Sequence, residues 1–131
     1  LDLLDSFHGQ PFAGLLAEAA LIDEFARAAA LILPSYQESA PMVVQQAMAA
    51  GLPVVGWRAG NLPHLATDGR EGLLLQPGDV DGLRRALHRL ATDDVYRREL
   101  AAAAARRAQS FPTWADTADL FFTELHEVAR G

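Results

Sequence analysis

The stretch from Leu31 to Val55, LILPSYQESAPMVVQQAMAAGLPVV, decides the fold that we predict for this chain. Leu31–Leu33 is an apolar run that is too short for a helix, and Pro34 stops it. Apolar residues then recur at helical spacing as far as Gly51, which can end a helix, and Pro53 opens a second short apolar run. Strand, helix and strand in this order predict two buried parallel strands joined by a right-handed crossover.

The same alternation continues on both sides of this stretch. Helical spacing of apolar residues predicts a helix between Pro11 and Ala30, and Gly72–Leu75 is predicted as a third strand. Leu1–Leu4 is a candidate fourth strand. The prediction is therefore one α/β domain over residues 1–131, with a Rossmann-like parallel sheet and flanking helices.

Three more helices are expected in the second half of the chain. Carboxylates that can accept hydrogen bonds from a first helical turn stand at the start of two of them, and a Phe-Pro-Thr sequence opens the third, which is amphipathic. The expected helices begin at Asp79 or Asp81, at Asp93 or Asp94, and at Phe111–Thr113.

Composition and charge exclude several classes of function. The chain has 131 residues, half of them apolar, and a net charge of −6, which argues against binding nucleic acid or an anionic membrane. It contains no cysteine, hence no disulfide and no thiolate site, and all its basic residues are arginines. Charged residues interrupt the apolar stretches, so no membrane span is expected. We expect a cytoplasmic piece of a longer protein, because the chain opens without a leader.

The arginines are expected to lie on the exposed surfaces of helices. They occur as pairs at 84–85, 97–98 and 106–107, inside or at the ends of predicted helices. Acidic residues lie nearby in the sequence, so we expect each pair to form ion pairs on an exposed helix face.

The turn after the first strand is the candidate site. In parallel α/β sheets, ligands lie beyond the carboxyl ends of the strands, which is where Pro34–Ala40 is expected. Backbone N–H groups at Ser39, Ala40 and Met42 would point from a helix N-terminus toward phosphate oxygens. Glu38 would accept hydrogen bonds from neutral hydroxyls, such as those of a sugar, although a solvated loop carboxylate is the simpler interpretation of this residue. The turn is consistent with a nucleotide-sugar site.

Several motifs carry a resemblance to a known family. They are PSYQES (34–39), QAMAAGLPVV (46–55), DGREGLLLQPGD (68–79) and the Phe111/Trp114 pair. In this order and spacing they resemble the C-terminal, donor-binding domain of the GT-B retaining glycosyltransferases of family 4. The resemblance implies that the chain is part of an enzyme that moves a sugar, of the hexosyltransferase type, from a nucleotide diphosphate sugar to an acceptor.

The resemblance also implies roles for individual residues. Glu38 would be catalytic and hold the donor sugar, Ser39, Ala40, Pro41 and Met42 would meet the diphosphate, and Gln46 would bind the ribose. Helix geometry alone does not choose between Gln45 and Gln46; the match to the family motif selects Gln46. The acceptor, a sugar, lipid or glycoconjugate, would bind upstream of this chain. No metal ion or cofactor would be required.

Two departures from the family pattern keep alternatives open. Gln46 replaces a carboxylate, and His64 replaces the Glu of a G-x-P-E turn. A degenerate module that binds without catalysis, or a nucleotide-sugar epimerase of the same fold, are the alternatives. Only three or four strands are predicted, so we also expect an unpaired strand edge, at Leu31–Leu33 or Leu1–Leu4, and self-association as a homodimer.

Overall fold

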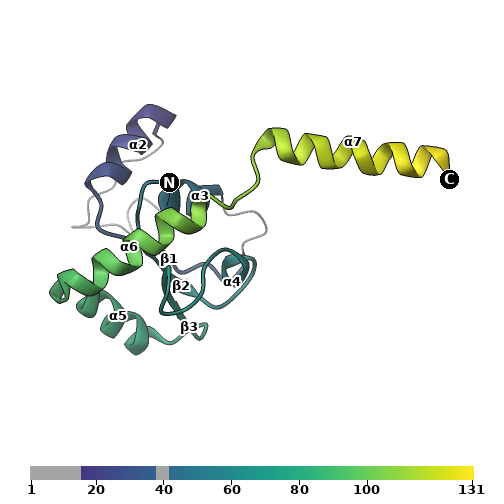
Figure 1. Cartoon of the computed structure of the whole chain (residues 1–131). Helices are drawn as coiled ribbons and strands as arrows, with labels where there is room; N and C mark the ends of the chain where they lie inside the picture. Colours follow the sequence, from purple (N-terminus) through teal and green to yellow (C-terminus); the bar gives the residue numbers. More distant parts are fainter. Residues whose placement is uncertain (1–15, 38–41) are drawn as a thin grey trace, which may run out of the picture.

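The structure of the chain is a computed structural model that describes residues 16–37 and 42–131 (Figure 1). Short strands alternate with helices as far as β3, and three longer helices follow. In chain order the elements are α2 (Glu18–Arg27), β1 (Leu31–Leu33), α3 (Met42–Ala49), β2 (Val54–Trp57), α4 (Leu62–Leu65), β3 (Gly72–Leu75), α5 (Val80–Thr92), α6 (Asp94–Ala108) and α7 (Trp114–Arg130).

The three strands form one parallel sheet in the order β1–β2–β3. Leu31 of β1 lies opposite Val54 of β2, and Val54 lies opposite Gly72 of β3. The connection from β1 to β2 carries α3, and the connection from β2 to β3 carries α4. The predicted α/β class with a parallel sheet is therefore confirmed.

The central strand β2 lies at the middle of the core, with both of its faces covered. Val54 and Val55 are fully buried and point to opposite faces of the sheet, so they belong to different apolar clusters. Val54 packs with residues of α3, α4 and α6, whereas Val55 packs with residues of α5 and α6. The first cluster also contains Val44, Met48, Leu62, Ala66, Leu74 and Ala104, and the second contains Ala86, Leu90 and Leu100.

The first strand is less buried than predicted. Ile32 is 46% exposed, and Leu31 and Leu33 are half-buried. Among the described residues β1 pairs only with β2, so it lies at an edge of the sheet. The apolar run correctly predicted a strand, but burial depends on neighbours from distant parts of the chain, which the run itself does not specify.

The outer edge of β3 is covered by the loop that precedes it and by the side chain of Arg58, which follows β2. The side chain of Asp68 accepts a hydrogen bond from Leu74 N–H at 2.9 Å, and the guanidinium of Arg58 donates to the Leu74 carbonyl at 3.3 Å. Arg58 and Asp68 also form an ion pair at 3.2 Å. Gly69 N–H donates to the carbonyl of Gly72 at 2.8 Å. These contacts occupy hydrogen-bonding groups that a further strand would need.

Two glycines explain local features of the strand–helix connections. Gly51 has a φ of 79°, a conformation that favours glycine, and it follows the end of α3 as predicted. At Gly72, a Cβ atom would lie 2.0 Å from the carbonyl oxygen of Val54. A side chain at this position would therefore prevent the close pairing of β2 with β3.

Two helix starts resolve alternatives that the sequence left open. Asp79 accepts a hydrogen bond from Gly82 N–H at 2.9 Å and caps α5. Asp93 accepts one from Tyr96 N–H at 3.0 Å and caps α6. In both cases the first aspartate of the predicted pair is the cap, because it stands three residues before the N–H group that it binds.

Three expectations about the first half of the chain need correction or lie outside the described residues. α2 ends at Arg27 rather than Ala30, because Ala28 has extended backbone angles (φ −78°, ψ 154°) and leads toward β1. The expected G-x-P turn contains the short helix α4, which was not predicted. The expected start of α2 near Pro11 and the candidate strand Leu1–Leu4 lie outside the described residues.

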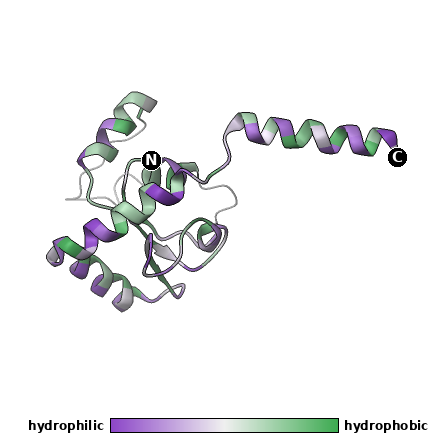
Figure 2. Cartoon of the chain, in the orientation of Figure 1, coloured by the Kyte–Doolittle hydropathy of each residue, from purple (hydrophilic) through white to green (hydrophobic). Residues whose placement is uncertain are grey.

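The last helix, α7, extends away from the rest of the molecule (Figure 1). Apolar and polar residues follow one another along it, as expected for an amphipathic helix (Figure 2), but none of its residues is buried. No helix among the described residues is both long and apolar enough to cross a membrane. The exposed apolar side chains of α7 are Trp114, Leu120, Phe121, Phe122, Leu125 and Val128.

A capping box begins α7. The hydroxyl oxygen of Thr113 accepts a hydrogen bond from Asp116 N–H at 3.1 Å, and the Asp116 carboxylate accepts one from Thr113 N–H at 2.7 Å. The Thr113 hydroxyl also donates to this carboxylate. These hydrogen bonds, from the backbone first and then from the hydroxyl, hold the pKa of Asp116 below its ordinary value of 3.8.

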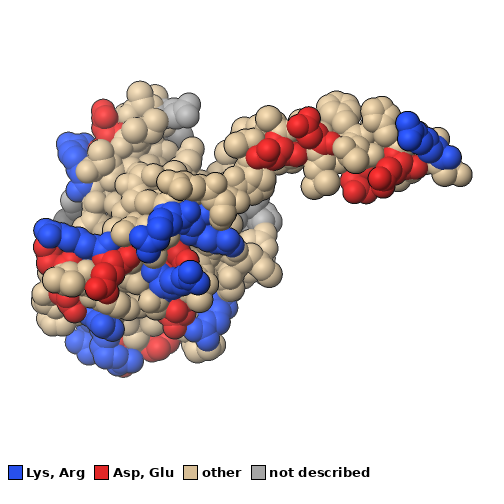
Figure 3. Space-filling model, viewed as in Figure 1, with Lys and Arg blue, Asp and Glu red and all other residues tan. Residues whose placement is uncertain are grey.

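The arginine pairs confirm one part of the prediction and contradict another. Arg84 pairs with Asp81, and Arg97 and Arg98 both pair with Asp94. The pair at 106–107, in contrast, has no acidic partner among the described residues, so the expectation of an ion-paired helix face is wrong there. Figure 3 shows arginine side chains gathered on the face of the molecule that α6 occupies.

Candidate functional site

The carboxyl ends of the three strands lie together at one end of the sheet, because all strands are parallel. We call this end of the sheet the carboxyl edge, as distinct from the outer strands. Segment 34–37 follows β1, segment 58–61 follows β2, and segment 76–79 follows β3. α3 begins at Met42, on the same side as the carboxyl end of β1. This edge is the position at which ligands bind in open parallel sheets.

Only part of the predicted site lies in the described residues. Glu38, Ser39, Ala40 and Pro41 lie outside them, so their predicted roles stay predictions. Met42 is the first residue of α3 and is 52% exposed. Gln46 lies one turn further along the same helix, and its side chain is exposed.

Gln46 lines a groove between α2 and α3. The groove has a volume of about 290 Å³, and Gln46 supplies its polar side chain. Its side-chain amide makes no hydrogen bond to another described residue, so both its donor and its acceptor face the groove or solvent. The other lining residues are apolar: Leu21, Ile22, Phe25, Ala49 and Ala50.

The neighbouring Gln45 faces a different hollow. This hollow, of about 410 Å³, lies between α3 and the start of α7 and is also lined by Met42, Trp114 and Thr117. Helix periodicity placed both glutamines beside the buried stripe, but it did not show that they face different elements. Gln46 faces α2, whereas Gln45 faces the base of α7.

An aromatic pair at the carboxyl edge was not singled out from the sequence. Tyr36 follows β1 and Trp57 ends β2, and their ring centroids lie 6.2 Å apart in a tilted arrangement. Trp57 is buried, whereas Tyr36 is 61% exposed and presents a ring beside the predicted donor turn. A Cβ atom on Gly78, in the segment after β3, would lie 3.7 Å from the Tyr36 hydroxyl. Tyr36 therefore stands where all three strand ends meet.

The arginine at this edge is engaged with the protein itself. Arg58 follows β2, and its guanidinium is bound to Asp68 and to the Leu74 carbonyl. Its charge is thus balanced by a carboxylate at 3.2 Å.

His64, which departs from the family pattern, contributes through its backbone. It lies in α4 with its side chain exposed, and its carbonyl accepts a hydrogen bond from Arg107 at 3.2 Å. No group of three or more metal-ligating side chains occurs within residues 16–37 and 42–131.

Curated relatives of the chain are named as glycosyltransferases. The chain is 37% identical over 113 residues to D-inositol 3-phosphate glycosyltransferase of Streptomyces scabiei, an alignment that covers 84% of this chain. The same alignment covers 25% of that relative, so the chain spans about a quarter of the length of the curated protein it matches.

Solved structures share the fold over most of the chain. Sucrose-phosphate synthase of Thermosynechococcus elongatus superposes with a TM-score of 0.85 at 26% identity and covers 99% of this chain and 34% of that one. The HepE protein of Anabaena in complex with UDP superposes with a TM-score of 0.70 at 25% identity and covers 79% of this chain and 29% of that one.

A family match covers the whole sheet and agrees with the named activities of the relatives. Residues 6–93, which include all three strands and the connections between them, match the family described as glycosyl transferases group 1. The chain therefore belongs to the glycosyl transferases group 1 family.

Proposed function

We propose that the chain is the donor-binding part of a longer glycosyltransferase. The longer enzyme would transfer a sugar, of the hexose type, from a nucleotide diphosphate sugar to an acceptor. The observation that carries this proposal is the family match over the whole β1–β3 sheet, in which the predicted donor turn follows β1 in the sequence. The named activities of the relatives and the UDP bound to HepE support a nucleotide-sugar donor.

In the proposed complex, the diphosphate lies at the N-terminus of α3. Ser39, Ala40, Pro41 and Met42 bring the backbone to it, and the helix N-terminus offers N–H groups and about half a positive charge. Glu38 accepts hydrogen bonds from the sugar hydroxyls beside the reacting carbon. Gln46 accepts one hydrogen bond from the ribose.

The proposed reaction proceeds with retention of the anomeric configuration, as in family 4. Glu38 acts as the catalytic residue by holding the donor sugar, while backbone dipoles and basic side chains of the remaining protein stabilise the departing diphosphate. The acceptor, a sugar, lipid or glycoconjugate, binds to the remaining protein. We place the reaction in the cytoplasm.

A degenerate binding module is the second candidate, and Gln46 is the observation that favours it. A neutral amide is a weaker acceptor than the carboxylate expected at this position. In the longer protein, Gln46→Glu should therefore tighten donor binding by about 1 kcal/mol, the difference between a neutral and a charged acceptor. Glu38→Ala should lower turnover far more than nucleotide affinity. Small and equal effects of both substitutions would favour the degenerate module.

A titration of the 131-residue chain with UDP tests the proposed site directly. Amide NMR signals in the first turn of α3 and at Gln46 should shift, with a dissociation constant on the order of millimolar because the upstream partners are missing. Gln46→Ala should weaken binding, and Gln45→Ala is the matched control, since Gln45 faces another hollow. Equal losses in both variants, or shifts confined to α5 and α6, would refute the assignment.

A further inference from the structure

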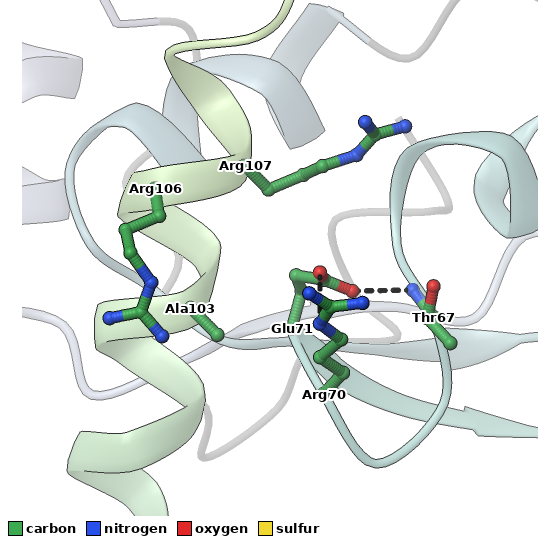
Figure 4. Close-up of a pocket in the computed structure, with 6 residues that line it drawn as sticks. All are labelled: Thr67, Arg70, Glu71, Ala103, Arg106 and Arg107. Atoms are coloured by element: carbon green, nitrogen blue, oxygen red, sulfur yellow. Dashed lines mark hydrogen bonds and ion pairs between the residues drawn. The ribbon is translucent and has the colours of Figure 1, made fainter.

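A hollow distinct from those that Gln45 and Gln46 face lies at the amino ends of the strands, opposite the proposed donor site. It has a volume of about 510 Å³ and separates the loop before β3 from the last turns of α6 (Figure 4). The residues that line it are Thr67, Arg70, Glu71, Ala103, Arg106 and Arg107.

The position of Glu71 places this hollow at the amino edge of the sheet. Glu71 immediately precedes β3, and its carbonyl accepts a hydrogen bond from Val54 N–H, at the first residue of β2. In a parallel sheet the amino and carboxyl ends lie at opposite edges. A ligand here would not meet a donor bound at the N-terminus of α3.

The carboxylate in the hollow is already satisfied by its own loop. The Glu71 side chain is 6% exposed and accepts a hydrogen bond from Thr67 N–H at 2.8 Å. It also faces the Arg70 guanidinium at 3.5 Å, and Arg70 itself is 76% exposed (Figure 4). The Glu71 carboxylate therefore fixes the loop through Thr67 N–H and pairs with the Nε atom of Arg70. The Arg70 side chain remains largely exposed to solvent.

The two arginines in the last turn of α6, Arg106 and Arg107, bring charge without a balancing acid among the described residues. The guanidinium of Arg107 donates to the carbonyls of His64 and Leu65 and to the Ser110 hydroxyl, all of which are neutral. Arg106 makes no hydrogen bond or ion pair with another described residue. Three arginines against one glutamate give the lining a net charge of +2, on a chain whose net charge is −6.

The negative end of the α6 dipole offsets only part of the positive charge of this lining. Basic residues in the last turn of a helix offset its negative end, which amounts to about half an elementary charge. Arg106 and Arg107 both lie in the last turn of α6, so about one and a half positive charges remain after that correction. This excess surrounds a hollow beside the small side chain of Ala103.

We propose that this hollow binds a small dianion of the phosphate class. Arg106, which has no partner among the described residues, is the cation that meets it. Arg70 lies on the opposite side of the hollow, and the Thr67 hydroxyl is a further donor. Arginine suits this ligand because its guanidinium presents paired N–H groups that match phosphate oxygens. The volume exceeds that of one phosphate ion and falls within the range of small-molecule sites, about 300–1,000 Å³. A phosphorylated metabolite is thus accommodated as well as free phosphate.

The test is an NMR titration of the 131-residue chain at low ionic strength, with inorganic phosphate, pyrophosphate and glucose 1-phosphate as separate probes. Amide signals of residues 67–71 and 103–107 should shift with saturation. Tighter binding of glucose 1-phosphate than of inorganic phosphate identifies a phosphorylated metabolite as the source, and the reverse order identifies free phosphate.

Arg106→Gln should weaken binding about tenfold, the effect of losing one hydrogen bond to a charged group. Arg106→Lys, which keeps the charge, should retain most of the affinity. Arg130→Gln is the matched control, because it removes the same charge from the exposed end of α7. The proposal is overturned if no probe shifts these signals, if the shifts occur only in α3, or if Arg106→Gln and Arg130→Gln weaken binding equally.

Discussion

α6 and α7 follow one another in the chain and have similar lengths, but only α6 packs against the core. α6 has 15 residues and buries Leu100, Ala103 and Ala104, although alanine dominates its sequence. α7 has 17 residues and three of the larger aromatic side chains, yet it buries none of its residues. Burial thus follows from what each helix lies against, and a helix rich in apolar residues is not thereby part of the core.

The two helices also differ in what keeps them ordered. α6 is fixed by packing against α3, α5 and β3, whereas α7 relies on its capping box and its own hydrogen bonds. Isolated helices shorter than about 12–15 residues are only marginally stable in water. α7, with 17 residues, is only slightly longer than this limit. We expect substitutions in the two helices to behave differently.

The largest expected effect comes from the same substitution placed in each helix. Leu100 on α6 is 1% exposed, and Leu125 on α7 is 51% exposed. Leu100→Ala should lower the free energy of unfolding by about 2–5 kcal/mol, because it leaves a cavity in the core. Leu125→Ala should change it by less than about 0.5 kcal/mol. Urea unfolding followed by circular dichroism measures both, and equal losses would show that α7 belongs to the cooperative unit.

The second prediction concerns self-association. The apolar residues of α7 form an exposed surface in the isolated chain, and a second copy can cover it. Light scattering over a concentration series should show a dimer. A chain that ends at Pro112, which keeps Phe111 packed against the first cluster, should be monomeric with its core intact. A dimer that survives this truncation would instead assign the contact to the exposed edge of β1.

A smaller effect is expected in the fluorescence of the two tryptophans. Trp57 is 4% exposed in β2, and Trp114 is 79% exposed at the start of α7. Acrylamide should quench Trp114 strongly and Trp57 weakly. Trp114→Phe should therefore remove the quenchable fraction, while Trp57→Phe should leave it. Similar quenching of both residues at low concentration would show that α7 is covered.

The smallest effect is the pH dependence of the α7 cap. The pKa of Asp116 is lowered in the folded chain, so its contribution to helix stability is present above the ordinary value of 3.8 and is lost as the pH falls through the lowered value. Amide hydrogen exchange in the first turn of α7 should therefore accelerate below pH 3.8 before exchange in α6 does. Thr113→Ala removes the hydroxyl donor but keeps the backbone N–H, so it should reduce this pH dependence without abolishing it. An unchanged profile in that variant would contradict the assigned cause.

Features that rest on local chemistry could be predicted from the sequence. Gly51 ends α3, and Asp79 caps α5, because each acts on backbone groups within a few residues of itself. The parallel sheet followed from the order of the apolar runs. Features that depend on distant neighbours were missed, such as the exposure of Ile32 and the lack of a packing partner for α7 within the described residues.

The predictions for the candidate site also differ between local features and features that depend on distant parts of the chain. The position of the candidate site was predicted from the rule for parallel sheets and from the family motifs, and it stays a prediction. Which hollow Gln45 and Gln46 each face depends on where α2 and α7 lie, and helix periodicity does not contain this information. Tyr36 was missed because its contact with Trp57 joins two strands. The pair at 106–107 was misjudged because Arg107 binds backbone carbonyls of α4, some forty residues away, and Arg106 has no partner among the described residues.

The covered edge of β3 makes the two sides of the sheet unequal as templates for another strand. Asp68 and Arg58 occupy the outward groups of Leu74, whereas β1 pairs only with β2 among the described residues. An extended peptide or a strand of a second chain that adds to this sheet should therefore pair with β1, and the Arg58–Asp68 pair protects β3 from such addition.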